Sequence, residues 1–157
     1  MKVFISHKKE DATTAAQIAA ELKKLKVDYY LDLLDPSITL NGKALTDHIK
    51  ANLNQCTDII VVMSGLTVYS QWVPFEVGMS AQVNMPTATY LKADAALPEF
   101  LSYWPRLKQL GDIEKYVTVR KRIELKALLH YGTFERASLH KEQEVSDFYA
   151  ALKQELR

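Results

Sequence analysis

Thr57–Ser80, TDIIVVMSGLTVYSQWVPFEVGMS, is the stretch of sequence that decides the fold. Its first part, Thr57–Ser64, contains a continuous apolar run, which is typical of a parallel strand covered on both faces. Its second part, Leu66–Ser80, leads into a predicted helix and carries one carboxylate, Glu76, among apolar side chains. Because burying an unpaired carboxylate is costly, Glu76 is the first candidate for a functional residue.

Alternating strand and helix patterns surround this stretch. Short apolar runs predict strands, and apolar residues spaced by three or four positions predict helices. The predicted strands are Lys2–Ser6, Asp28–Leu34, Thr57–Ser64 and Thr87–Leu91, and the predicted helices are Ala12–Lys26, Lys43–Gln55 and Val73–Val83. This alternation predicts an α/β fold with a parallel sheet, right-handed crossovers and flanking helices.

The pattern is less regular in the C-terminal part of the chain. Ala93–Asp112 contains prolines and an apolar series, and we expect short helices there that cap the sheet. Ile113–Val119 is the candidate for a fifth strand. Arg120–Leu129 and Lys141–Leu156 are predicted helices, joined by a segment around Gly132. The sequence shows no repeat or linker, so we expect residues 1–157 to form a single domain.

Composition limits the classes of function. Twenty basic and nineteen acidic side chains give a net charge of +1, and without a basic block the chain is not expected to bind nucleic acid. Cys56 is the only cysteine, which excludes an internal disulfide and is typical of a reducing compartment. No signal peptide and no apolar run of about 18 residues is present, so we expect a soluble cytoplasmic protein that does not insert into a membrane.

Three polar segments are predicted to meet at one edge of the sheet. Ligands of open parallel α/β sheets bind outside the carboxyl ends of the strands. Ser6–Asp11, Asp35–Gly42 and Ser64–Glu76 each follow a predicted strand, so we expect them to converge at that edge. The sequence therefore predicts a ligand site built from segments that are far apart along the chain.

Several common sites are absent from the sequence. No G-x-G-x-x-G follows the first strand, Gly42-Lys43 lacks the rest of a phosphate-binding loop, and no G-x-S-x-G elbow is present. Ser64 stands where a receiver domain would carry a phosphate-accepting carboxylate. The four histidines have no metal-ligand spacing with one another or with Cys56, so no metal site is predicted.

These motifs resemble the Toll/interleukin-1 receptor (TIR) domains, especially the bacterial forms. Val3–His7, VFISH, is similar to the first-strand box of that family, and Ser70–Glu76 is similar to its S-x-W-x-x-x-E stretch. Asp35–Gly42 lies where TIR domains carry the BB loop, although it lacks the Arg-Asp pair and the Pro-Gly of many relatives. The resemblance covers Met1–Leu91 and implies a flavodoxin-like, three-layer fold with a mostly parallel five-stranded sheet.

The resemblance also implies an activity. Many TIR domains are NAD⁺ glycohydrolases or cyclases, which take NAD⁺ as the substrate and need no further cofactor. It assigns Glu76 as the catalytic residue and places the substrate near the helix start and the end of the first strand. The candidate substrate-binding residues are Phe4, Ser6, His7, Lys8, Asp35, Tyr69, Ser70 and Trp72.

Simpler roles are open for several of these residues. Trp72 and Tyr69 are each as well explained by packing as by a ligand contact. Lys8–Asp11 reads most simply as a solvated charged loop, and Asp35 as a turn residue. Ser70 is placed to cap the helix that follows it.

The resemblance leaves more than one function open. The chain resembles the TIR subunits of Thoeris-type antiphage systems, which implies a nucleotide signal sensed by a separate effector. Self-association through TIR–TIR contacts is expected from the family. The alternatives are a non-enzymatic TIR adaptor, or host-signalling mimic, and a nucleoside deoxyribosyltransferase, which also uses a glutamate at a glycosidic carbon.

Overall fold

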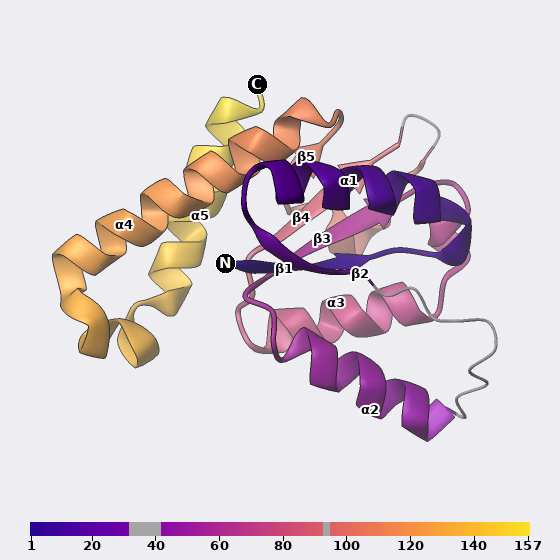
Figure 1. The fold of residues 1–157 in the computed structure, drawn as a ribbon, viewed down its shortest axis with the longest axis horizontal. Helices are drawn as coiled ribbons and strands as arrows, with labels where there is room; N and C mark the ends of the chain where they lie inside the picture. The colour runs from indigo at the N-terminus through magenta and orange to yellow at the C-terminus, as the bar shows by residue number, and fades with distance from the viewer. Residues whose placement is uncertain (32–41, 93–94) are drawn as a thin grey trace.

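A computed structural model describes residues 1–31, 42–92 and 95–157, the side chains of residues 131–139 excepted. Within these residues five strands form one sheet in the order β2-β1-β3-β4-β5, and every pairing is parallel (Figure 1). The strands are β1 (Lys2–Ser6), β2 (Asp28–Leu31), β3 (Asp58–Met63), β4 (Thr87–Leu91) and β5 (Arg106–Leu107). The parallel α/β fold predicted from the sequence is confirmed, and the strand order is that of flavodoxin-like folds.

Helices cover both faces of the sheet and make it the middle of three layers (Figure 1). One face is covered by α1 (Ala12–Lys24), α4 (Gly111–Leu139) and α5 (Lys141–Glu155). The other face is covered by α2 (Gly42–Leu53) and α3 (Trp72–Gln82). Single-turn helices lie at η1 (Lys9–Asp11), η2 (Thr67–Tyr69) and η3 (Glu99–Leu101). No helix in the described ranges is long and apolar enough to cross a membrane.

β3 is the centre of the core. All six of its residues are buried, and their side chains alternate between the two hydrophobic clusters. Ile60 and Val62 join the cluster under α1, α4 and α5, whereas Ile59 and Val61 join the cluster under α2 and α3. A strand buried on both faces has no polar alternation, which is why its sequence reads as an unbroken apolar run.

The predicted fifth strand is wrong. Ile113–Val119 forms part of α4, and the fifth strand is the two-residue β5. The buried residues Ile113, Tyr116 and Val117 follow a helical period of three and four, but their bulky apolar side chains also suit a strand. β5 is too short to show any alternation.

The helix pattern at the C-terminus also differs from the prediction. α4 continues through Gly132 without a break and ends at Leu139, and α5 begins at Lys141. The two helices pack side by side and extend past the end of the sheet (Figure 1). Between residues 95 and 110 the predicted short helices reduce to η3 and the strand β5. β2 ends at Leu31 in the described part of the chain, and the predicted residues 32–34 lie outside it.

A buried polar network ties α4 and α5 to the first residue of β3. Asp58 is fully buried and accepts hydrogen bonds from the Tyr116 hydroxyl at 2.9 Å and from Arg120 Nε at 3.0 Å. Arg120 Nη1 also donates to Glu144 of α5 at 2.8 Å. Burial lowers the pKa of the Arg120 guanidinium, but the charge of Asp58, with a further contribution from Glu144, outweighs burial and raises it above its ordinary value.

Candidate active site

Glu76 lies on the face of α3 that packs against the sheet. The buried residues of this helix, Val73, Glu76, Val77 and Ser80, share one side of it. Only 5 % of Glu76 is exposed, so a carboxylate replaces an apolar side chain in the packed stripe. Ser70 lies just before the helix, and its Oγ accepts a hydrogen bond from the Val73 N–H at 3.3 Å. This contact satisfies a backbone donor at the start of the helix.

Ser6 holds the Glu76 carboxylate from the end of β1. Its Oγ donates a hydrogen bond to Oε2 of Glu76, and both residues are buried. An ionised carboxylate can only accept hydrogen bonds, so a hydroxyl donor offsets part of the cost of burying it. The contact brings together two of the three predicted segments, Ser6–Asp11 and Ser64–Glu76. Most of the third, Asp35–Gly42, lies outside the described residues.

His7 and Lys8 continue the chain beyond β1. His7 is half-buried, and its Nδ1 lies 3.2 Å from the backbone oxygen of Ile5. Lys8 is half-buried, and its Nζ forms an ion pair with Glu10 at 3.3 Å. Both side chains therefore lie in the loop that follows the strand carrying Ser6, as the sequence places them.

Tyr69 and Trp72 flank the start of α3. Tyr69 is 81 % exposed, so it does not pack in the core. Trp72 is half-buried and meets the ring of Phe75 edge to face, with centroids 5.8 Å apart. The sequence leaves packing and a ligand contact open for both residues. The exposure of Tyr69 favours a ligand contact, whereas Trp72 packs against Phe75 and is also partly accessible to solvent.

Phe4, a predicted substrate-binding residue, lies in the core rather than at the edge of the sheet. The Phe4 side chain is fully buried in the cluster under α2 and α3, with its ring centroid 5.3 Å from that of Tyr30. Strand alternation explains this position, because every second residue of a central strand must face one core. Asp35 lies outside the described residues.

Asp11 is a carboxylate whose environment the sequence does not reveal. The loop Lys8–Asp11 is predicted to be solvated, and for Asp11 this is wrong, because only 2 % of it is exposed. Its Oδ2 accepts hydrogen bonds from Ser64 Oγ at 2.6 Å and Thr67 Oγ1 at 2.5 Å, and Oδ1 lies 3.3 Å from Lys92 Nζ. The only hint in the sequence is that hydroxyl residues follow the central strand.

A family model described as "TIR domain" matches residues 3–127, which is most of the chain. The chain belongs to the TIR domain family. The match includes Ser6 with most of β1, the Ser70–Glu76 stretch and most of α4, so it extends beyond the region in which the sequence motifs are recognisable.

Among solved structures, this TIR domain is similar to a chain described as the TIR domains of the activated Roq1 resistosome directly recognizing the pathogen effector XopQ. The two share 15 % identity over 98 % of this chain and 81 % of that chain, with a TM-score of 0.46. No curated protein is similar enough to this TIR domain to count as a match.

Asp11 makes the stability of the TIR domain depend on pH. Burial raises the pKa of Asp11, but the hydrogen bonds from Ser64, Thr67 and Lys92 outweigh it, and the pKa lies below its ordinary value of 3.8. A carboxyl whose pKa is lowered by folding contributes stability above its unfolded pKa and loses it as the pH falls through the folded pKa.

We therefore expect wild-type protein to lose more free energy of unfolding between about pH 5 and about pH 2 than the variant Asp11→Asn. Urea unfolding followed by circular dichroism at each pH measures the difference. Asp47→Asn, at an exposed carboxylate paired with Lys43, is the control and is expected to keep the wild-type pH dependence. An identical pH dependence for wild type and Asp11→Asn would contradict a lowered pKa of Asp11 in the folded protein.

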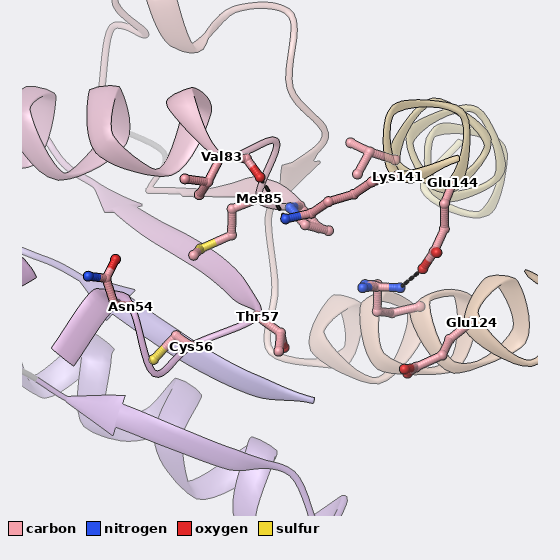
Figure 2. A pocket seen from close by; sticks show the side chains of 11 residues that line it. Asn54, Cys56, Thr57, Val83, Met85, Glu124, Lys141 and Glu144 are labelled. Atoms are coloured by element: carbon pink, nitrogen blue, oxygen red, sulfur yellow. Dashed lines mark hydrogen bonds and ion pairs between the residues drawn. The ribbon is translucent and has the colours of Figure 1, made fainter. Parts of the chain in front are cut away.

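A cavity of about 560 Å³ lies at the opposite edge of the sheet (Figure 2). Thr57 and Met85 line it, just before β3 and β4, together with Lys141 and Glu144 of α5. Lys141 Nζ donates to the Val83 backbone oxygen at 2.6 Å, and Glu144 points toward α4 (Figure 2). The cavity is therefore separate from Glu76. Lys141 ties α5 to the segment before β4, and Glu144 ties α5 to α4.

Cys56 also lines this cavity. Burial raises the pKa of its thiol to about 11, so the thiol is protonated at neutral pH and is a poor nucleophile. In the described part of the chain, no group of three or more His, Cys, Asp or Glu side chains is arranged to hold a metal ion.

Proposed function

We propose that this TIR domain cleaves the bond between nicotinamide and ribose in NAD⁺, and that Glu76 is the catalytic residue. The observation that carries the proposal is the buried carboxylate of Glu76, held by Ser6 at the carboxyl edge of a parallel sheet. Ligands of this fold class bind at that edge. Burying a carboxylate among apolar side chains costs free energy, which supports a functional role for Glu76.

The chemistry needs one carboxylate rather than two. When the C1′–N bond breaks, its electron pair goes to the nicotinamide nitrogen, and the cationic ring leaves as a neutral molecule. No acid is needed to protonate it, in contrast to ordinary glycosides. The ribose becomes an oxocarbenium ion, and Glu76 stabilises this positive charge. The interaction is strong because burial keeps the local dielectric constant low.

The acceptor that captures the ribose decides the product. Water gives ADP-ribose and a proton, whereas an atom of the substrate's own adenine or ribose gives a cyclic nucleotide. Tyr69 and Trp72 are suited to contact a base or ribose, since one is exposed and the other half-buried at the start of α3. His7, Lys8 and Ser70 lie in the loops on either side, and Phe4 supports the strand end from within the core.

The cellular role is part of the proposal. The likeness of the motifs to Thoeris-type TIR subunits supports a bacterial antiphage role, in which the product is a signal for a separate effector. Self-association is supported by apolar side chains exposed around the start of α3, namely Leu66, Val68, Tyr69 and Phe75. A neighbouring copy bound there would contact the loops that frame Glu76.

Mass spectrometry of the products formed from NAD⁺ tests the proposal. The wild-type protein is incubated with NAD⁺ over a range of protein concentrations, because assembly would make the activity per molecule rise with concentration. Free nicotinamide together with ADP-ribose, or with a cyclic form of it, is the expected result. Intact NAD⁺ at every concentration contradicts the proposal and favours a TIR adaptor, and turnover of deoxynucleosides instead of NAD⁺ favours a deoxyribosyltransferase.

A further inference from the structure

We propose that Asp11 is a positioning residue, which acts through Ser64 and Thr67 to set the start of α3 and so the place of Glu76 relative to Ser6. The effect on catalysis rests on the proposed function, whereas the effect on the position of α3 does not. Asp11 does not itself reach Glu76, because the two carboxylates belong to opposite faces of the sheet.

The assignment to opposite faces follows from strand alternation. In β3, Val62 belongs to the cluster under α1, so Ser64, two residues later, continues that face. In β1, Phe4 belongs to the cluster under α2 and α3, so Ser6 continues the other face. Asp11 contacts Ser64, and Glu76 contacts Ser6, which places the sheet edge between the two carboxylates.

Asp11 joins the ends of three neighbouring strands. It ends η1, which follows β1, and its N–H donates to the Lys8 backbone oxygen at 2.8 Å. Ser64 follows β3 and Lys92 follows β4, and both donate to the Asp11 carboxylate, at 2.6 Å and 3.3 Å. Hydrogen bonds to an ionised carboxylate are about twice as strong as neutral ones. A single buried charge therefore fixes the loop after β1 against the ends of β3 and β4.

The same carboxylate fixes the segment that leads into α3. Thr67 begins η2, and its Oγ1 donates to Asp11 Oδ2 at 2.5 Å. Ser64 Oγ, held by Asp11, accepts hydrogen bonds from the N–H groups of Leu66 at 3.2 Å and Thr67 at 3.3 Å. The Thr67 backbone oxygen in turn accepts from the Ser70 N–H at 2.9 Å.

Ser70 completes the connection to the catalytic carboxylate. Its Oγ accepts from the Val73 N–H in the first turn of α3, and Glu76 lies one turn further along the same helix. The series from Asp11 to this helix is continuous and begins with two short, buried hydrogen bonds, from Ser64 and Thr67. A change at Asp11 is therefore expected to shift or loosen the helix start. Displacement of a reacting group by about 1 Å can cost on the order of 100-fold in rate.

Fluorescence of Trp72 reports on the start of α3 directly. The chain has two tryptophans, and Trp104 is removed by the background substitution Trp104→Phe, leaving Trp72 as the single reporter. In this background we expect Asp11→Asn and Thr67→Val each to increase quenching of Trp72 by acrylamide and to shift its emission to the red. Asp47→Asn, at the exposed Lys43 ion pair, is expected to leave both unchanged.

The kinetic test uses the same substitutions in the wild-type background. We expect kcat for nicotinamide release to fall about 10-fold or more, because displacement of Glu76 weakens its stabilisation of the transition state. KM is measured in the same assays, because Tyr69 and Trp72 at the helix start also bear on substrate binding. Melting temperatures are measured for every variant, and kinetics are run well below them. Thr67→Val keeps the shape of the side chain and decides the question if Asp11→Asn does not fold.

The two readouts separate the two proposals. Increased Trp72 quenching in the variants supports the positioning role, even if wild-type protein releases no nicotinamide and the proposed function fails. Unchanged quenching in folded Asp11→Asn and Thr67→Val overturns the positioning role, whatever the activity. A loss of kcat that only matches the fraction of unfolded protein also overturns it.

Discussion

Arg120→Met is expected to lower the free energy of unfolding by about 3–5 kcal/mol, because it leaves a buried carboxylate without its cation. Asp58 is fully buried at the start of β3, and Arg120 is the cation that contacts it in the described structure. The same guanidinium bridges to Glu144 of α5. Removing it also removes a contact with the Phe148 ring, whose centroid lies 5.9 Å from the guanidinium carbon.

Arg122→Met is a matched control on the same helix. Arg122 also pairs with a glutamate of α5, Glu155, but the two side chains are 54 % and 47 % exposed. Exposed ion pairs contribute about 1 kcal/mol or less, so this variant is expected to unfold almost as wild type does. Urea unfolding measures both variants, and equal effects at the two positions would show that the buried network does not hold α4 and α5 to the sheet.

Much of the fold is predictable from the sequence because the central strands are strongly constrained. β1 and β4 have the predicted bounds, and β3 lies within one residue of its prediction at each end. α3 begins one residue before its predicted start. A strand covered on both faces must be apolar throughout, so its signal does not depend on the rest of the structure.

The parts that the sequence does not reveal depend on tertiary contacts. β5 has two residues and forms only because β4 offers an edge to pair with. Residues 113–119 have side chains that suit a strand, but packing on the sheet selects the helix. Gly132 lowers helix propensity by about 1 kcal/mol relative to alanine, yet α4 continues through it.

The candidate site likewise contains one carboxylate that the sequence reveals and one that only tertiary contacts reveal. Glu76 is recognisable because a carboxylate interrupts an apolar helical face, and this needs only the sequence. Asp11 stands among charged residues in a polar loop, so nothing local distinguishes it from a solvated side chain. Its burial follows from Ser64 and Thr67, which are more than 50 residues away along the chain at separations of 53 and 56.

Glu76→Gln is expected to reduce the rate of nicotinamide release by about 100-fold or more. The substitution keeps the size and shape of the side chain and removes its negative charge, so it removes the stabilisation of the oxocarbenium ion. Stability is expected to be unchanged or higher, because a buried charge is replaced by a neutral amide. Ser6→Ala keeps the charge but loses the hydroxyl that orients it, so its rate is expected to lie between those of wild type and Glu76→Gln.

Glu114→Gln is the matched control for this substitution. Glu114 is exposed on α4, so the same chemical change is expected to leave both the rate and the melting temperature at their wild-type values. A decrease in rate or melting temperature that is shared by Glu76→Gln and Glu114→Gln would come from protein preparation or from the change in net charge, and not from the loss of the Glu76 carboxylate.

Nicotinamide release from NAD⁺ by wild-type and Glu76→Gln protein, at equal concentration and with both shown to be folded, tests the central claim most directly. The proposed site predicts steady release by the wild type and release close to the uncatalysed rate by the variant. Equal release by the two proteins would contradict the role of Glu76.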